Sequence, residues 1–127
     1  MGKIVIVDDS RLARMYTASC LRKEGHEVHE VEPTSIFEVA KALLELQPDL
    51  LIMDFLMPHC PGTSLARICH EDPQLQQLRM LVLTAHRDEI ITARLKHLGV
   101  SQVLFKPVEP GELQDAVAAL LAQPNPS

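Results

Sequence analysis

Aromatic side chains are scarce in this sequence. Tryptophan is absent, and one tyrosine and three phenylalanines make up 3% of the 127 residues. Basic residues are also too few for an excess of positive charge, because 12 Lys and Arg face 17 Asp and Glu, for a net charge of −5. A general nucleic-acid or anionic-membrane surface needs that excess. We therefore expect an aliphatic core and no direct binding of nucleic acid or membrane by this chain.

Long hydrophobic runs and cysteine frameworks are missing as well. The apolar run at residues 4–7 is too short for a signal peptide or a membrane span. The three cysteines are an odd number without framework spacing, so we expect free thiols and a cytoplasmic protein: Cys20, Cys60 and Cys69. The His–Cys pairs at 59–60 and 69–70 stand too far apart, on an expected loop and helix, to share a zinc ion.

The most informative stretch is residues 49–58. Four apolar residues lead directly into Asp54, and Pro58 stops regular structure soon after. An apolar run this short is typical of a strand buried on both faces, as in a parallel sheet covered by helices. Asp54 then lies at the carboxyl end of the strand, either as a turn residue or as part of a site.

Strand and helix patterns alternate five times along the chain. Aliphatic runs predict strands at residues 4–7, 27–31, 50–54, 80–83 and 100–105. Helical spacing predicts helices from Ser10 to about Glu24, from Pro33 to Pro48, over about 63–71, up to Gly99, and over about 113–121. This order predicts one α/β domain over residues 1–122, a doubly wound parallel sheet, with residues 123–127 as a flexible tail or the start of a linker.

Polar side chains follow four of the five predicted strands. They are Asp8 and Asp9, Asp54, Thr84, and Lys106. Because the carboxyl ends of parallel strands meet at one edge of a sheet, we expect these groups to form one site. Each position alone also fits a structural role: a helix cap at Asp8–Asp9, a turn hydroxyl at Thr84, a solvated lysine at Lys106.

The three carboxylates determine which chemistry such a site supports. At an effective dielectric near 20, two charges 4 Å apart repel by about 4 kcal/mol. A divalent cation relieves that repulsion, and oxygen ligands favour Mg²⁺, with Mn²⁺ as an alternative. A lysine and a hydroxyl beside a carboxylate would stabilise a phosphoryl group on it, and an aspartate that forms an acyl phosphate is known covalent chemistry.

These residues form a recognisable set of motifs. In chain order they are Val7-Asp8-Asp9-Ser10, Met53-Asp54, Met57-Pro58, Gly62, Leu83-Thr84-Ala85 and Lys106-Pro107. Together they resemble the receiver domain of two-component response regulators, over about residues 3–122. The resemblance implies a chemotaxis-regulator-like, flavodoxin-like fold with five parallel strands in the order 2-1-3-4-5.

The resemblance also implies roles for the site residues. Asp54 is expected to accept a phosphoryl group from a sensor histidine kinase or a histidine phosphotransfer protein. Mg²⁺ is expected to bind Asp8, Asp9, Asp54 and the backbone carbonyl of Leu56. Thr84 is expected to be the switch hydroxyl and Lys106 the lysine that pairs with the phosphoryl group. The bond between Lys106 and Pro107 is expected to be cis.

The sequence departs from the family pattern at a few positions. Val103 stands where an aromatic residue usually rotates inward, Pro61 where an acidic residue is common, and Pro33 near the entry of the second helix, which lacks the usual glycine. Leu56 cannot orient a water by hydrogen bonding, so we expect slow to moderate self-dephosphorylation. His86 is expected to be an exposed helix-capping residue.

The sequence thus predicts a phosphorylatable signalling switch. It would catalyse its own phosphorylation and dephosphorylation without being a metabolic enzyme, and it would act on an unknown downstream target as a monomer or weak homodimer. The alternatives are a receiver without phosphotransfer that serves as an interaction module, a flavodoxin-like cofactor binder, and an aspartate-dependent phosphatase. The last two lack, respectively, a phosphate-binding loop after the first strand and a second aspartate at Leu56.

Overall fold

A parallel five-stranded sheet forms the centre of the molecule in a computed structural model that describes residues 1–124. The strands are β1 (Lys3–Val7), β2 (Glu27–Val31), β3 (Leu50–Asp54), β4 (Arg79–Thr84) and β5 (Gln102–Phe105). They pair in the order β2-β1-β3-β4-β5, which confirms the predicted order.

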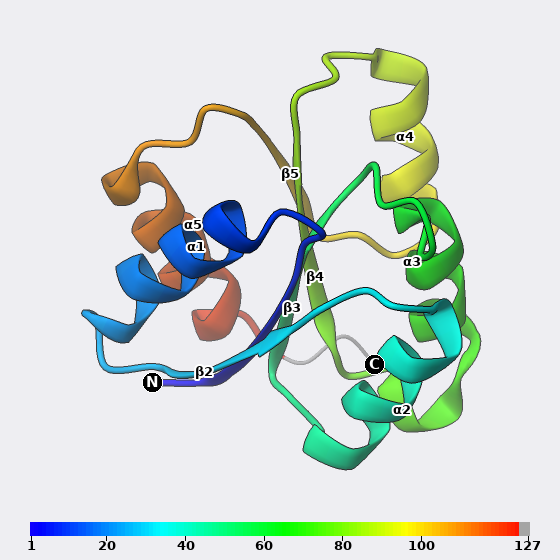
Figure 1. Cartoon of the computed structure of the whole chain (residues 1–127), viewed down its shortest axis with the longest axis horizontal. Coiled ribbons are helices and arrows are strands. Elements are labelled where there is room, and N and C mark those ends of the chain that lie inside the picture. Colours follow the sequence, from blue (N-terminus) through cyan, green and yellow to red (C-terminus); the bar gives the residue numbers. More distant parts are fainter. Residues whose placement is uncertain (125–127) are drawn as a thin grey trace.

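Helices cover both faces of this sheet. They are α1 (Arg11–Arg22), α2 (Ile36–Leu46), α3 (Gly62–Glu71), α4 (Glu89–His97) and α5 (Pro110–Ala122), with a short 3₁₀ turn η1 (Pro73–Leu75) after α3. Figure 1 shows α1 and α5 on one face of the sheet and α2, α3 and α4 on the other. No helix in this part of the chain is long and apolar enough to cross a membrane.

The core consists of two aliphatic clusters, one on each face of the sheet. Alternate residues of a strand point to opposite faces, so Val5 packs under α2 and α3 while Ile6 packs under α1 and α5. Leu51 and Ile52 divide in the same way on β3, and all four side chains are at most 1% exposed. Burying each such side chain stabilises the fold by about 1.5–3 kcal/mol.

Serine side chains cap the first turns of α1 and α2. Ser10 accepts a hydrogen bond from the Ala13 N–H at 3.2 Å and caps α1 as predicted. The predicted start of the second helix at Pro33 was wrong. Ser35 caps α2 by accepting a hydrogen bond from the Glu38 N–H at 3.1 Å, so the helix begins at Ile36.

The last strand also begins later than the sequence pattern predicted. The Val100 N–H still donates to the Leu95 carbonyl at the end of α4, at 3.0 Å. The Ser101 N–H then donates to the Met80 carbonyl at 2.8 Å, and the β5 ladder starts at Gln102. Gly99, with φ +94°, provides the left-handed turn between helix and strand.

The sequence did not reveal a contact at the end of the sheet where β4 begins. Arg79, the first residue of β4, is buried and donates a hydrogen bond to the Gln123 carbonyl just after α5. The first residue of the predicted tail is thus attached to the domain, while residues 125–127 lie outside the described part of the chain.

All three cysteines are free thiols, as expected, and all three are buried. Cys60 and Cys69 lie in the same core cluster, where burial raises the pKa of Cys60 to about 11 and that of Cys69 to about 12. Both thiols are therefore protonated at neutral pH, and neither is a reactive thiolate.

Candidate functional site

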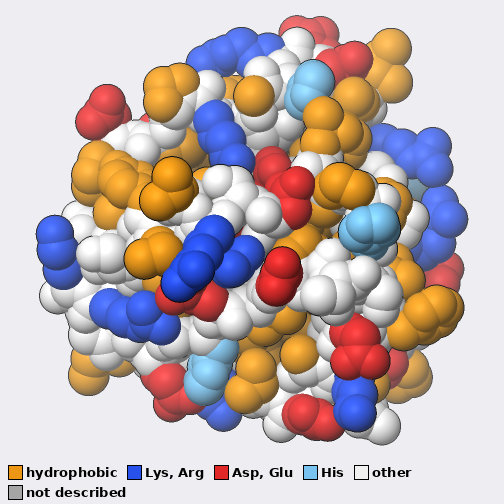
Figure 2. Space-filling view, in the orientation of Figure 1, with side chains coloured by type: hydrophobic (Ala, Val, Ile, Leu, Met, Phe, Trp, Pro, Cys, Tyr) orange, Lys and Arg blue, Asp and Glu red, His pale blue; other side chains and the backbone are white. Residues whose placement is uncertain are grey.

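Three aspartates meet where β1 and β3 end. One carboxylate oxygen from each of Asp8, Asp9 and Asp54 lies within 4.8 Å of the other two. Asp8 is buried, Asp54 is half-buried and Asp9 is exposed, so the cluster opens to solvent on one side. Acidic side chains gather near the centre of the face that Figure 2 presents.

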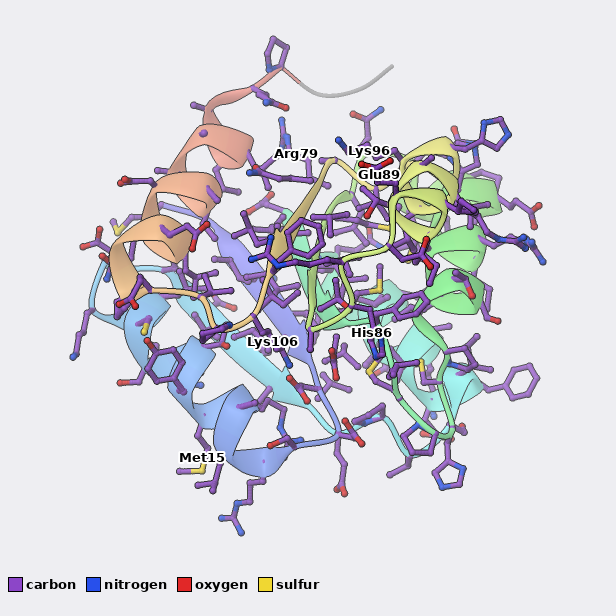
Figure 3. All side chains as sticks on the ribbon, turned by 90° about the horizontal axis from the view of Figure 1, so that it is seen from above. Met15, Arg79, His86, Glu89, Lys96 and Lys106 are labelled. Atoms are coloured by element: carbon purple, nitrogen blue, oxygen red, sulfur yellow. The ribbon has the colours of Figure 1, made fainter. Side chains whose placement is uncertain are left out.

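Lys106 brings a positive charge to this cluster. Its ammonium nitrogen lies 3.4 Å from Oδ2 of Asp8 and 3.4 Å from Oδ1 of Asp54. The side chain is 30% exposed and extends from the loop after β5 (Figure 3). The Lys106–Pro107 peptide bond is cis, as predicted. One lysine thus neutralises part of the charge of two carboxylates.

The environment of Asp54 changes its acidity. Burial raises the pKa of Asp54 above its ordinary value, and the nearby Asp8 carboxylate raises it further. Lys106 opposes both effects, as does the hydrogen bond that the Phe55 N–H donates to Oδ1 of Asp54 at 2.9 Å. The net result is a raised pKa, because desolvation is the largest contribution.

Asp8 is held by backbone and side-chain hydrogen bonds that leave one oxygen facing Lys106. Its Oδ1 accepts from the Ser10 N–H at 2.9 Å, and its carbonyl accepts from the Arg14 guanidinium. Arg14 also lies 3.7 Å from a carboxylate oxygen of Glu30 on β2. Sequence reasoning missed this positioning role of Arg14, which its place one turn after the Ser10 cap would have suggested.

Thr84 ties together the loops after β4 and β5. The residue is 2% exposed, and its carbonyl accepts a hydrogen bond from the Lys106 N–H at 2.8 Å. Its hydroxyl oxygen accepts a hydrogen bond from the His86 N–H at 3.0 Å. Among the described residues, that hydroxyl makes no hydrogen bond to Asp54.

His86 does not cap a helix, contrary to the prediction. The cap of α4 is Asp88, whose Oδ1 accepts hydrogen bonds from the Ile90 and Ile91 N–H groups. An aspartate accepts two such bonds directly at this position, whereas the His86 side chain, which is exposed (Figure 3), turns to the edge of the Phe55 ring. The ring centroids are 6.4 Å apart.

The structure explains why the motif has a glycine at position 62. Its N–H donates to the Phe55 carbonyl at 3.0 Å, which folds the loop after Asp54 back on itself. A Cβ atom at this position would lie 3.0 Å from the Phe55 carbonyl oxygen and 3.2 Å from that of Asp54. A side chain here would therefore require the backbone that carries Asp54 to shift.

Two positions bear on the predicted switch chemistry. Leu56 is 55% exposed in the loop beside Asp54. Because its side chain is aliphatic, it offers no hydrogen bond to a water near that carboxylate. Val103 is half-buried and packs against the core cluster below α4. The half-buried aromatic ring on β5 belongs instead to Phe105, and the guanidinium carbon of Arg87 lies 4.7 Å from its centroid.

The donor set of the acidic cluster fits a hard divalent cation. Its three converging ligand atoms are carboxylate oxygens, without the nitrogen or sulfur donors that zinc or copper prefers. The residues predicted to hold Mg²⁺ through their side chains are thus brought together. Thr84 and Lys106 lie at the ends of the two strands beside them, where ligands bind in such sheets.

Comparison with known proteins agrees with this geometry. Residues 4–118 match the response regulator receiver domain family. The chain is 31% identical to the phosphate regulon transcriptional regulatory protein PhoB of Rhizobium meliloti over 99% of its own length and 55% of that protein, so it spans about half the length of this relative. It is also 31% identical to protein PilH of Pseudomonas aeruginosa, over 96% of this chain and 99% of PilH.

Solved structures show the same architecture. The structure of a putative response regulator from Chloroflexus aurantiacus is 31% identical, with a TM-score of 0.88 over 96% of this chain and 98% of that one. The chemotaxis response regulator CheY4 of Vibrio cholerae, at 24% identity, shares the fold, with a TM-score of 0.86 over 94% of this chain and 98% of that one. With its strand order and the clustered aspartates, the chain belongs to the response regulator receiver domain family of two-component signalling.

Proposed function

We propose that this chain is a phosphoacceptor switch in which Asp54 receives a phosphoryl group. The observation that carries the proposal is the position of Asp54, half-buried at the edge of the sheet, with Lys106 and two further carboxylates around it. The donor is a phosphorylated histidine of a sensor kinase or phosphotransfer protein. The chain acts as a signalling component and not on a metabolite.

The transfer requires Asp54 in its ionised form. One of its carboxylate oxygens forms a bond to phosphorus while the bond from phosphorus to the donor imidazole nitrogen breaks, and the electron pair of that bond stays on the nitrogen. Lys106 reaches Asp54 and would neutralise charge on the phosphoryl oxygens. Phe55 fixes the orientation of the carboxylate through its N–H.

Asp8, Asp9, Asp54 and the Leu56 backbone carbonyl would hold Mg²⁺ or Mn²⁺ in this proposal. A bound cation there supplies positive charge that offsets the mutual repulsion of the carboxylates and of the incoming phosphoryl oxygens. Asp8 is the best prepared ligand, because the Ser10 N–H and the Arg14 guanidinium fix its carboxylate and carbonyl.

The response to phosphorylation would begin at Thr84. Its buried hydroxyl donates to a phosphoryl oxygen on Asp54 and thereby favours one of two conformations of the loop before α4. The surface formed by α4, β5 and α5 changes with that loop and binds the downstream target.

An acyl phosphate donor with Mg²⁺, followed by intact mass spectrometry, tests the proposal. Wild type should gain one phosphoryl group, Asp54→Ala should gain none, and the exposed Asp115→Ala should behave as wild type. Wild type without an adduct would favour the alternative of an interaction module that is not phosphorylated.

A further inference from the structure

Arg87, in the loop after β4, contacts Phe105 at the end of β5. None of the roles described so far uses this contact. The guanidinium carbon lies 4.7 Å from the ring centroid, a cation–π geometry. The two residues border a groove of about 450 Å³ that is also lined by the α4 cap Asp88 and by Glu89, Thr92, Ala93 and Lys96 of α4. Figure 3 shows Glu89 and Lys96 on α4 at this groove.

Both members of the pair connect to Thr84 through a single step. Arg87 directly follows His86, whose N–H donates to the Thr84 hydroxyl oxygen at 3.0 Å. Phe105 is the register partner of Thr84 across β4 and β5, and it directly precedes Lys106. Thr84 thus contacts the backbone next to both members of the pair.

We propose that the Arg87–Phe105 contact is a latch that opens when Asp54 is phosphorylated, in place of an aromatic residue at Val103. This inference rests on the proposed function. The hydrogen bond of the Thr84 hydroxyl in this structure is the one it accepts from the His86 N–H, and in the proposal the hydroxyl turns from there to a phosphoryl group on Asp54. Turning removes the acceptor of the His86 N–H, which frees the exposed loop that carries Arg87.

Release of Arg87 has a defined consequence for the surface. The face of the Phe105 ring that the guanidinium covers becomes exposed at the groove beside α4. A cation–π contact at an exposed site corresponds to about a two- to fivefold change in an equilibrium constant. Arg87→Leu should therefore shift the latch toward the open form by about that factor without phosphorylation.

A single introduced tryptophan reports the latch, because the 127 residues contain none. In Phe105→Trp, acrylamide quenching of the fluorescence should rise by about twofold or more when acyl phosphate and Mg²⁺ are added, as the cation leaves the ring face. Adding Arg87→Leu to this variant should give high quenching from the start, with little further change. Arg87→Lys, which keeps a cation, should restore the response to phosphorylation.

Hydrogen exchange of the wild-type protein gives a second readout that needs no tryptophan. Phosphorylation should speed exchange of the His86 amide, and Thr84→Ala should speed it without phosphorylation, since both remove its acceptor. Intact mass, measured in parallel, separates the two claims. An adduct on Asp54 with unchanged quenching and unchanged His86 exchange overturns the latch and leaves the proposed function standing. Absence of an adduct overturns both.

Discussion

The Lys106 ammonium nitrogen lies 3.4 Å from Oδ1 of Asp54 and 3.4 Å from Oδ2 of Asp8. These contacts join the ends of β1, β3 and β5, three strands that are far apart in the sequence. One positive charge among three carboxylates leaves the cluster negative overall. The fold therefore keeps an excess of negative charge at the place where the proposed chemistry needs a cation.

The raised pKa of Asp54 predicts a pH-dependent cost in stability. The unfolded chain ionises this carboxyl at its ordinary pKa of 3.8, below the pKa in the folded protein. Between the two values the folded state binds more proton, so stability falls as pH rises through this window. In chelator, Asp54→Asn should raise the melting temperature at neutral pH, and this gain should shrink as pH falls through the folded pKa. A gain that grows on acidification would contradict the burial argument.

Asp9 allows a test of the repulsion in the cluster. It is exposed, so removal of its charge should raise the melting temperature of the metal-free protein by only about 1–4 °C. Asp9→Asn should also abolish measurable Mg²⁺ binding in isothermal titration calorimetry. Asp115→Asn, at an exposed position of α5 that forms no ion pair with the residues described, serves as the charge-matched control. A drop of several degrees for Asp9→Asn without metal would refute the repulsion.

Alanine substitutions at two glycines test whether Gly62 is required by its close contacts. Gly62→Ala would place a Cβ atom 3.0 Å from the Phe55 carbonyl oxygen, so we expect a loss of about 1–3 kcal/mol in the free energy of unfolding. Phosphorylation should slow as well, because the displaced loop follows Asp54. Gly111→Ala meets no atom within 4 Å and should be neutral or stabilising by up to about 1 kcal/mol. Equal urea midpoints for the two variants would argue against the close approach.

Leu56 predicts how long the phosphoryl group persists. Its exposed aliphatic side chain offers no hydrogen bond to an attacking water, so the wild-type adduct should decay slowly to moderately. Leu56→Asn places an amide at the same point and should accelerate decay by about 10-fold, less than the roughly 10²–10⁴-fold of a positioned acid or base, because an amide orients water but takes up no proton. Loss of phosphate is followed after removal of the donor. A wild-type half-life of seconds in Mg²⁺ would contradict this account.

The strands and the parallel sheet could be predicted from the pattern of apolar residues in the sequence. Runs such as Leu50–Met53 are apolar because both faces of β3 are covered, and this alone indicated a parallel sheet and placed Asp54 at its edge. Residue spacing could also group Asp8 with Asp54, since parallel strands end together. The strand order came from the resemblance, because alternation of strands and helices does not specify which strands are neighbours.

Contacts between distant residues could not be predicted. The burial of Arg79 depends on the Gln123 carbonyl, and the position of His86 depends on the Phe55 ring. In both pairs the two residues are too far apart in the sequence for a local sequence pattern to predict the contact. The start of α2 was missed for a local reason: Pro33 and Ser35 both suit a first turn, and only the hydrogen bond that the Glu38 N–H donates to the Ser35 side chain distinguishes them.

The most direct measurement locates the phosphoryl bond itself. Borohydride reduces an aspartyl phosphate to homoserine, so protein treated with acyl phosphate and Mg²⁺, then reduced and digested, can be sequenced by mass spectrometry. Our account predicts homoserine at position 54, dependent on Mg²⁺ and diminished in Lys106→Ala. Homoserine at Asp8 or Asp9 instead, or unmodified Asp54 in a protein that binds Mg²⁺, would contradict it.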